Sequence, residues 1–170
     1  GVGAREVGFM AGMMKKLSNR SDCVFTGKGL SFGGSLLRPE ATGYGTVYFA
    51  EQMLQRVGRS FDGLRVSVSG AGNVAQYAIE KAMSLGAKIV TVSDSSGTVV
   101  DEAGFTPKKL AALMEVKNKL HGRVSDYAER VDAAFLPGQR PWQVPVDVAL
   151  PCATQNELDE NDAATLVKNG

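Results

Sequence analysis

A short glycine turn, placed between a strand pattern and a helical pattern, limits the folds open to this sequence. The segment RVSVSGAGNVAQYAIEKA carries it. Before the turn, Leu64, Val66 and Val68 indicate a strand that is buried in a sheet. After it, apolar residues recur at helical spacing from Val74 to Met83. A strand that enters a helix through a tight turn begins a β–α–β unit, so we expect an α/β protein with a parallel sheet.

The turn itself, GAGNVA at residues 70–75, fits the GxGxxA form of the dinucleotide-binding fingerprint. Gly70 allows the tight turn after the strand, and Gly72 lets a pyrophosphate approach the backbone closely. Ala75 is small enough for the helix to pack against the strand. The first N–H groups of the helix would then face the phosphates. The alternative is a plain strand-to-helix turn that holds no ligand.

An acidic residue, Asp94, follows the next expected strand, residues 88–92. An acid in this place accepts hydrogen bonds from the ribose hydroxyls and favours NAD. Lys117, Lys119 and Arg123 lie in a segment that can fold back toward this corner, where charge-assisted hydrogen bonds would favour the 2′-phosphate of NADP. The alternative for these basic residues is a solvated helix face.

The rest of the chain alternates strands with helices. Helices are expected at residues 2–17, 39–57, 74–83, 106–117, 124–130 and 159–167, and strands at residues 65–69, 88–92, 134–136 and 146–150. This order predicts a Rossmann-like, doubly wound parallel sheet with helices on both faces, preceded by a helical hinge segment. Because Gly1 opens the chain and a turn signal at residues 169–170 closes it, we expect an incomplete fragment of a two-domain enzyme.

Composition argues against several functional classes. The net charge is +1, so no basic field favours nucleic acid or an anionic membrane surface. The apolar runs are too short, and too often interrupted by glycine, to span a bilayer. Cys23 and Cys152 have no metal-ligand spacing, and two buried thiols in a reduced, cytoplasmic compartment are the simplest interpretation. We therefore expect no nucleic-acid partner, no membrane partner and no metal.

Several longer motifs are more specific than the fingerprint. They are GVGAREVGFMAGMMKKL, TGKGLSFGGSLLRPEATGYG, SGAGNVAQYAIEKA, SDSSG and LPCATQNEL. Together they closely resemble the hexameric glutamate dehydrogenases of the bacterial, mostly NADP-dependent type, over essentially the whole chain. Leucine, phenylalanine and valine dehydrogenases share the fold and the glycine turn, but RPEATGYG with PCATQNEL points to glutamate. The alternatives are a stand-alone dinucleotide-binding module without catalysis and a leucine- or phenylalanine-type amino-acid dehydrogenase.

The resemblance implies the reversible oxidative deamination of L-glutamate to 2-oxoglutarate and ammonium, with NADP as the cofactor and NAD as the alternative. It also implies a cytoplasmic homohexamer that serves amino-acid metabolism and nitrogen assimilation. Residues 1–45 would form the end of the substrate domain and the hinge, and residues 46–170 a dinucleotide-binding domain that is truncated at its C-terminus. The family's catalytic lysine and aspartate would lie before Gly1, so no catalytic residue is expected here and the fragment itself is expected to be inactive.

The resemblance also assigns contacts by position in the motifs. It places the pyrophosphate at the glycine turn, residues Gly70, Ala71, Gly72, Asn73 and Val74. The specificity corner, which distinguishes NADP from NAD, would consist of Asp94, Ser95, Lys117 and Arg123. Arg38 and Thr42 would lie near the nicotinamide, Ala153, Thr154 and Gln155 would line the nicotinamide ribose, and Thr26 would line the substrate pocket. Leu120 replaces a basic residue of the family at the specificity corner, which would weaken phosphate recognition unless Lys119 substitutes. We expect NADP.

Other prominent residues are expected to have structural roles. His121, the only histidine, is expected on a solvated loop, and contact with a 2′-phosphate is the alternative. Trp142 lies between two prolines and is expected to be a packing anchor. Met10, Met13 and Met14 are expected at a domain or subunit contact.

Overall fold

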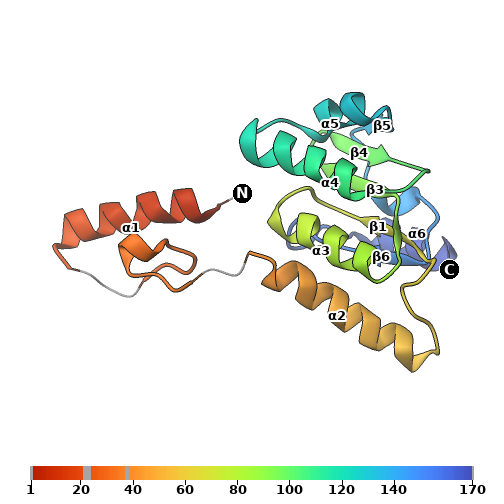
Figure 1. Cartoon of the computed structure of the whole chain (residues 1–170), viewed down its shortest axis with the longest axis horizontal. Coiled ribbons are helices and arrows are strands. Elements are labelled where there is room, and N and C mark those ends of the chain that lie inside the picture. The colour runs from red at the N-terminus through yellow and green to blue at the C-terminus, as the bar shows by residue number, and fades with distance from the viewer. Residues whose placement is uncertain (1, 21–23, 37–38, 170) are drawn as a thin grey trace. The chain divides into compact units, whose positions relative to one another are not determined.

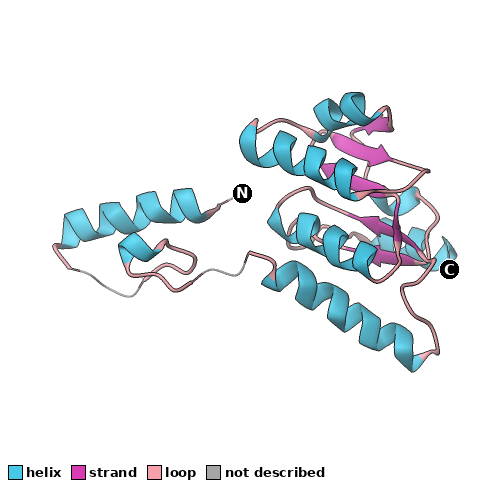
Figure 2. Ribbon diagram, viewed as in Figure 1, coloured by secondary structure: helices cyan, strands magenta, loops and turns pink. Residues whose placement is uncertain are grey.

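The computed structural model describes residues 2–20, 24–36 and 39–169, and the chain divides into two compact units between residues 39 and 40 (Figures 1 and 2). The N-terminal unit is built on α1, Ala4–Ser18, a helix that the sequence predicted. Gly3 N donates to the Glu6 carboxylate at 2.9 Å and so satisfies a backbone donor at the start of the helix. Lys15 and Lys16 lie in the last turn, where the helix dipole favours cations.

A short 3-10 helix, η1, Leu30–Phe32, packs against α1 within the same unit. The Phe32 ring lies over two glycines of α1, since a Cβ added at Gly8 or Gly12 would lie 3.3 or 3.4 Å from ring atoms. The three methionines of α1, at positions 10, 13 and 14, are exposed. Their contact with another domain or subunit remains a prediction.

The C-terminal unit contains the predicted parallel sheet. Its central strand β1, Arg65–Val68, lies between β2, Lys88–Ile89, and β6, Val148–Leu150, and pairs in parallel with both. Residues 66–68 are 0% exposed, so β1 is buried on both faces, as its apolar pattern predicted.

Helices cover both faces of this sheet, which confirms the expected α/β class (Figure 2). The helix α3, Asn73–Ser84, connects β1 to β2, and α2, Ala41–Arg56, packs against α3. The last helix, α6, Glu160–Asn169, packs on the short 3-10 helix η3, Pro141–Gln143, which itself contacts β1. This order of strand, helix and parallel strand is the one that the glycine turn predicted.

The expectation of one continuous strand at residues 88–92 is wrong, because the chain changes its pairing partner at Val90. Val90 N donates to Val66 O at 2.9 Å, which keeps β2 on the parallel sheet. Beyond this point β3, Thr91–Asp94, pairs antiparallel with β4, Gly97–Val100. The expected strand is therefore two strands that belong to two sheets.

The β3–β4 hairpin was not predicted, and its turn explains why. Ser95 and Ser96 connect the strands without the Asn-Gly or Asp-Gly pair that is typical of tight hairpins. Asp94 closes the turn instead, since its Oδ1 accepts a hydrogen bond from Ser96 N at 2.8 Å. The strand β4 also pairs with β5, Ala134–Pro137, in antiparallel orientation. The strand predicted at residues 134–136 therefore does not join the parallel sheet.

The second half of the unit carries two helices beside the β3–β4 hairpin. α4, Pro107–Met114, begins as predicted, with Thr106 as its N-cap; the Thr106 hydroxyl accepts from Lys109 N at 3.3 Å. It continues into a π-helical turn, η2, Glu115–Lys119, which the sequence did not predict. α5, Val124–Val131, follows after a short loop.

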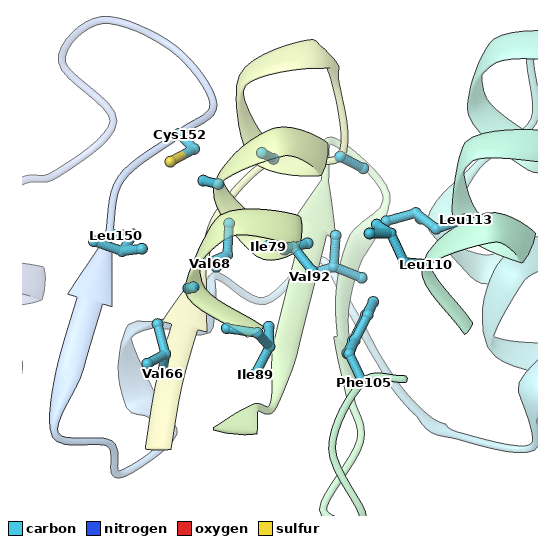
Figure 3. Packing of buried hydrophobic residues seen from close by; sticks show 14 of the residues in the cluster. Val66, Val68, Ile79, Ile89, Val92, Phe105, Leu110, Leu113, Leu150 and Cys152 are labelled. Carbon is cyan, nitrogen blue, oxygen red and sulfur yellow. The ribbon is translucent and has the colours of Figure 1, made fainter. Parts of the chain in front are cut away.

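The core of this unit lies between β1 and the helices α3 and α4 (Figure 3). Val66, Val68 and Ile79 are 0% exposed there, and so is Leu113 on α4. Burial of each such aliphatic side chain contributes roughly 1.5–3 kcal/mol to folding. Trp142 on η3 is 1% exposed, which confirms its role as a packing anchor.

Candidate functional site

The turn after β1 has the geometry that a phosphate-binding backbone requires. Gly70 has φ +80°, and a Cβ added there would lie 2.8 Å from Cys152 O and 3.0 Å from Ala153 Cα. At Gly72, the N-cap of α3, an added Cβ would meet no atom of the described residues within 4 Å. The first turn of α3 therefore opens onto free space at Gly72, where an anion can approach the helix N-terminus. Ala75 is 0% exposed and packs the helix against the strand, as the fingerprint requires.

Two buried serines fix this turn at the carboxyl edge of the strands. Ser93 Oγ accepts from Gly70 N at 3.0 Å, and Ser69 Oγ accepts from Cys152 N at 2.9 Å. They tie together the ends of β1, β3 and β6, so the loop at residues 153–155 comes beside the glycine turn. Ala153, Thr154 and Gln155 are all exposed on that loop. Ligands of open α/β sheets bind at this edge.

Thr42 is placed beside the first turn of α3 by the crossing of α2 and α3. The neighbouring Gly43 makes this crossing close, because an added Cβ would lie 2.6 Å from Val74 O and 2.7 Å from Ala78 N. Thr42 is exposed in the first turn of α2, and its carbonyl accepts from Thr46 Oγ1 at 3.0 Å.

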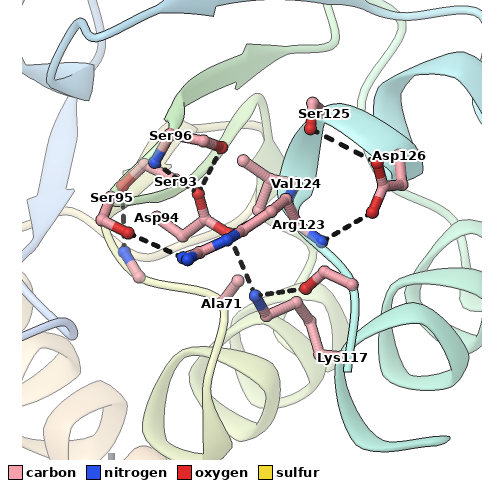
Figure 4. A network of polar contacts seen from close by, with 12 residues as sticks. Ala71, Ser93, Asp94, Ser95, Ser96, Lys117, Arg123, Val124, Ser125 and Asp126 are labelled. Atoms are coloured by element: carbon pink, nitrogen blue, oxygen red, sulfur yellow. Dashed lines mark hydrogen bonds and ion pairs between the residues drawn. The ribbon is translucent and has the colours of Figure 1, made fainter. Parts of the chain in front are cut away.

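The carboxylate of Asp94 is engaged by the protein itself (Figure 4). Ser96 donates to Oδ1 from its backbone N at 2.8 Å and from its hydroxyl at 2.6 Å. Lys117 Nζ and Val124 N each donate to Oδ2 at 3.0 Å. Burial raises the pKa of Asp94, but these hydrogen bonds outweigh burial and hold the pKa below its usual value. Both oxygens are thus occupied from within the chain, which leaves little capacity to accept from ribose hydroxyls.

The basic residues of this corner differ in what they contact. The Lys117 side chain is 18% exposed, and its ammonium also donates to Gly122 O at 2.9 Å, so it does not lie on a solvated helix face. The exposed Arg123 guanidinium donates to Ser95 Oγ at 2.8 Å. His121 is exposed on the loop after η2, as expected. The corner therefore presents an exposed guanidinium and a serine hydroxyl beside a carboxylate whose charge is balanced, a combination that suits a phosphate.

One amide pair of this region was not identified from the sequence. Gln76 is 1% exposed in α3, and its amide pairs with that of Asn118 in η2. The one sequence signal is a glutamine on the apolar side of the helix, three positions before Ile79. A polar side chain on a buried helix face needs a hydrogen-bonding partner, but the sequence does not say where that partner is.

Two of the predicted site residues, Arg38 and Thr26, precede the C-terminal unit in sequence. Arg38 lies outside the described residues. Thr26 lies in an exposed turn of the N-terminal unit. Among the residues that the structure describes, no cluster of histidine, cysteine, aspartate or glutamate could hold a metal ion. In the same residues, no helix is both long enough and apolar enough to cross a membrane.

The thiol of Cys152 is packed beneath the site rather than presented to it. It is 9% exposed, and burial, assisted by the Glu157 carboxylate, raises the pKa of the thiol to about 12. The expectation of a buried thiol is confirmed for Cys152, whereas Cys23 lies outside the described residues.

Comparison with known proteins gives one consistent family. Residues 33–170 match the model of the family described as Glutamate/Leucine/Phenylalanine/Valine dehydrogenase. The chain is 71% identical over 170 residues to an NADP-specific glutamate dehydrogenase of Salmonella typhimurium and 70% identical to that of Escherichia coli K12, with the whole chain and 38% of each relative covered. A crystal structure of Plasmodium falciparum glutamate dehydrogenase matches with a TM-score of 0.86 at 42% identity, covering 99% of this chain and 36% of that one. The chain thus spans less than two fifths of the length of these relatives.

Proposed function

Because the chain belongs to the glutamate/leucine/phenylalanine/valine dehydrogenase family, we propose that it forms the cofactor-binding part of an NADP-dependent glutamate dehydrogenase. The observation that carries the cofactor assignment is the engaged carboxylate of Asp94, which accepts from Ser96, Lys117 and Val124. The identities of 71% and 70% to two NADP-specific glutamate dehydrogenases support the same assignment.

The proposed reaction of the whole enzyme is the reversible conversion of L-glutamate, NADP⁺ and water to 2-oxoglutarate, ammonium, NADPH and a proton. A bound nicotinamide would supply the acceptor for the hydride from the α-carbon of glutamate. The residues of this chain bind and orient the cofactor. Gly70, Ala71, Gly72, Asn73 and Val74 would hold the pyrophosphate at the start of α3. No residue of this chain is proposed to be catalytic.

The nicotinamide half of the cofactor is proposed to lie between α2 and the loop after β6. Thr42 would contact the nicotinamide end, and residues 153–155 would line its ribose. These groups fix which face of the ring meets the substrate, so their contribution is orientation rather than proton transfer. Arg38 is assigned to the same end and Thr26 to the substrate pocket by their places in the family motifs alone.

The 2′-phosphate is proposed to lie against Ser95 and Arg123, while Lys117 balances the charge of Asp94. An unpaired carboxylate at this place would repel the phosphate and accept from the ribose hydroxyls instead. For NAD to be preferred, Asp94 would have to give up bonds that it already makes inside the protein. Lys119 is exposed on the same segment and supplies charge beside Leu120.

The domain organisation and partners are also proposals that rest on the family resemblance. Residues 1–45 would belong to the substrate domain and hinge, and residues 46–170 to the dinucleotide-binding domain. The division of the chain between residues 39 and 40 supports a boundary in this region. The whole protein would be a cytoplasmic homohexamer that acts on glutamate, 2-oxoglutarate and ammonium.

A chimeric enzyme tests this function. The chain would replace the corresponding 170 residues of the Escherichia coli relative, and the product would be assayed with L-glutamate. We expect NADP⁺-dependent formation of 2-oxoglutarate and a much slower reaction with NAD⁺. An assembled chimera that uses NAD⁺ in preference would contradict the cofactor assignment. One that binds NADP⁺ but gives no turnover would favour the stand-alone binding module.

A further inference from the structure

Gln76 and Asn118 form a reciprocal amide pair between α3 and the π-helical turn η2. Asn118 Nδ2 donates to Gln76 Oε1 at 2.9 Å, and Gln76 Nε2 donates to Asn118 Oδ1 at 3.1 Å. The two residues are 42 positions apart in sequence, and Gln76 is 1% exposed. A buried amide is favourable only when its polar groups are bonded, so the pair holds η2 in one place relative to α3.

Gln76 also reaches the glycine turn. Its Nε2 donates a second hydrogen bond to Ala71 O at 2.8 Å, so the carbonyl and both N–H groups of this amide are used. Ala71 stands between the two glycines that are proposed to hold the pyrophosphate. A displacement of η2 would therefore leave buried polar groups at the turn unbonded, or would move the turn with it.

At the other end of the pair, Asn118 directly follows Lys117. Val116, which precedes them, is 0% exposed and anchors η2 in the core. The lysine ammonium can bond only to groups within reach of its four-carbon stem, so its contact with Asp94 depends on where the backbone of η2 is held. From this backbone position it reaches Asp94 Oδ2 at 3.0 Å. A continuous set of contacts thus runs from the pyrophosphate turn to the specificity corner.

We propose that the Gln76–Asn118 pair positions Lys117 against Asp94 and thereby sets the preference for NADP over NAD. This inference rests on the proposed function, because it concerns the same cofactor site. Neither side chain needs to touch the cofactor, since both act through the placement of Lys117. A pair that served stability alone would, when removed, weaken the binding of both cofactors in the same proportion.

The substitution Asn118→Ala in the 170-residue chain removes the pair at its exposed end and leaves the core side chains in place. Calorimetry would give the dissociation constants for NADP⁺ and for NAD⁺. Carbon-detected NMR titration would give the pKa of Asp94 in the absence of any nucleotide. Asn161→Ala, at an exposed asparagine of α6, is the matched control, and Asn118→Gln keeps the amide and tests rescue.

We expect Asn118→Ala to weaken NADP⁺ binding about tenfold and NAD⁺ binding less than about twofold. The pKa of Asp94 should rise toward its usual value, because Lys117 is no longer held against it. Asn118→Gln should recover most of the NADP⁺ affinity that Asn118→Ala loses. Equal weakening of both cofactors, or an Asp94 pKa that does not move, would overturn the inference. If the unsubstituted chain binds NAD⁺ more tightly, or binds neither cofactor, the proposed function fails instead. The Asp94 pKa then still decides whether the pair positions Lys117.

Discussion

Lys117 Nζ lies 3.0 Å from Asp94 Oδ2, in a pair whose side chains are only 18% and 12% exposed. An acid at the end of this strand, taken by itself, favours NAD. In this protein the carboxylate has a structural role. It closes the β3–β4 turn by accepting a hydrogen bond from Ser96 N, and it accepts another from Val124 N at the start of α5. In the corner beside the glycine turn, the negative charge of Asp94 is therefore balanced by Lys117. The exposed guanidinium of Arg123 then supplies the positive charge that favours a phosphate.

Removal of the lysine should change cofactor preference more than it changes the fold. Lys117→Ala should weaken NADP⁺ binding roughly tenfold or more, about 1.4 kcal/mol, because Asp94 is left unpaired beside the 2′-phosphate. The free energy of unfolding should fall by about 1–3 kcal/mol, as measured by urea denaturation. Lys108→Ala, at an exposed lysine of α4, is the matched control. Proportional losses of NADP⁺ and NAD⁺ affinity would argue against this role.

The two glycines of the turn should respond differently to the same substitution. Gly70→Ala should lower the free energy of unfolding by about 1–3 kcal/mol, because φ is +80° and the new methyl group would lie 2.8 Å from Cys152 O. Gly72→Ala should leave stability nearly unchanged, since its Cβ meets no described atom within 4 Å, but should abolish cofactor binding. Thermal unfolding and calorimetric titration of both variants separate the two effects. Normal cofactor binding by Gly72→Ala would contradict the placement of the pyrophosphate.

The loss of folding stability at low pH should be caused in part by Asp94. Its pKa in the folded chain is held below the unfolded value, which is about 3.9, so the ionised carboxylate stabilises the fold. This stabilisation is complete well above pH 4 and is lost as the pH falls through the lowered pKa. The free energy of unfolding of Asp94→Asn should therefore fall less steeply between pH 5 and pH 3 than that of the unsubstituted chain. Urea denaturation across this range provides the test, with Glu160→Gln as an exposed control. If the free energies of unfolding of Asp94→Asn and of the unsubstituted chain fell in parallel over this pH range, Asp94 would not contribute to the acid sensitivity of the fold.

The thiol of Cys152 should be inert in the folded chain. Its pKa is raised to about 12, so the thiolate fraction near pH 8 is on the order of 10⁻⁴. Alkylation by iodoacetamide should be more than about 100-fold slower than for a small free thiol, and should accelerate in guanidinium. Peptide mass spectrometry follows this site separately from Cys23. Rapid modification of the folded chain at Cys152 would show that the residue is accessible.

Features with a local signal were predictable from the sequence. The glycine turn requires only neighbouring residues, and Thr106 with Pro107 marks a helix start by its own chemistry. Alternation of strand and helix then led to the parallel sheet around β1. The Asp94 corner was also anticipated, because an acid and a distant basic segment are each visible in the sequence.

Features that depend on distant partners were missed. Val90 looks like the middle of one apolar strand, and only the competing partners β1 and β4 divide it. The Ser95-Ser96 turn lacks a hairpin signature because an aspartate side chain, rather than glycine, closes it. The Gln76–Asn118 pair joins residues 42 positions apart, and nothing local links them. The division at Val90 and the Gln76–Asn118 pair depend on residues far apart in the sequence, which periodicity does not encode, whereas the Asp94–Ser96 bond is local but leaves no glycine signature.

Calorimetric titration of the 170-residue chain with NADP⁺ and with NAD⁺, at low and at physiological salt, tests the central claim most directly. We predict that NADP⁺ binds at least about tenfold more tightly, and that its advantage shrinks as salt screens the exposed Arg123. Tighter binding of NAD⁺ would mean that Asp94 leaves Lys117 to hold the ribose hydroxyls, and would contradict the account.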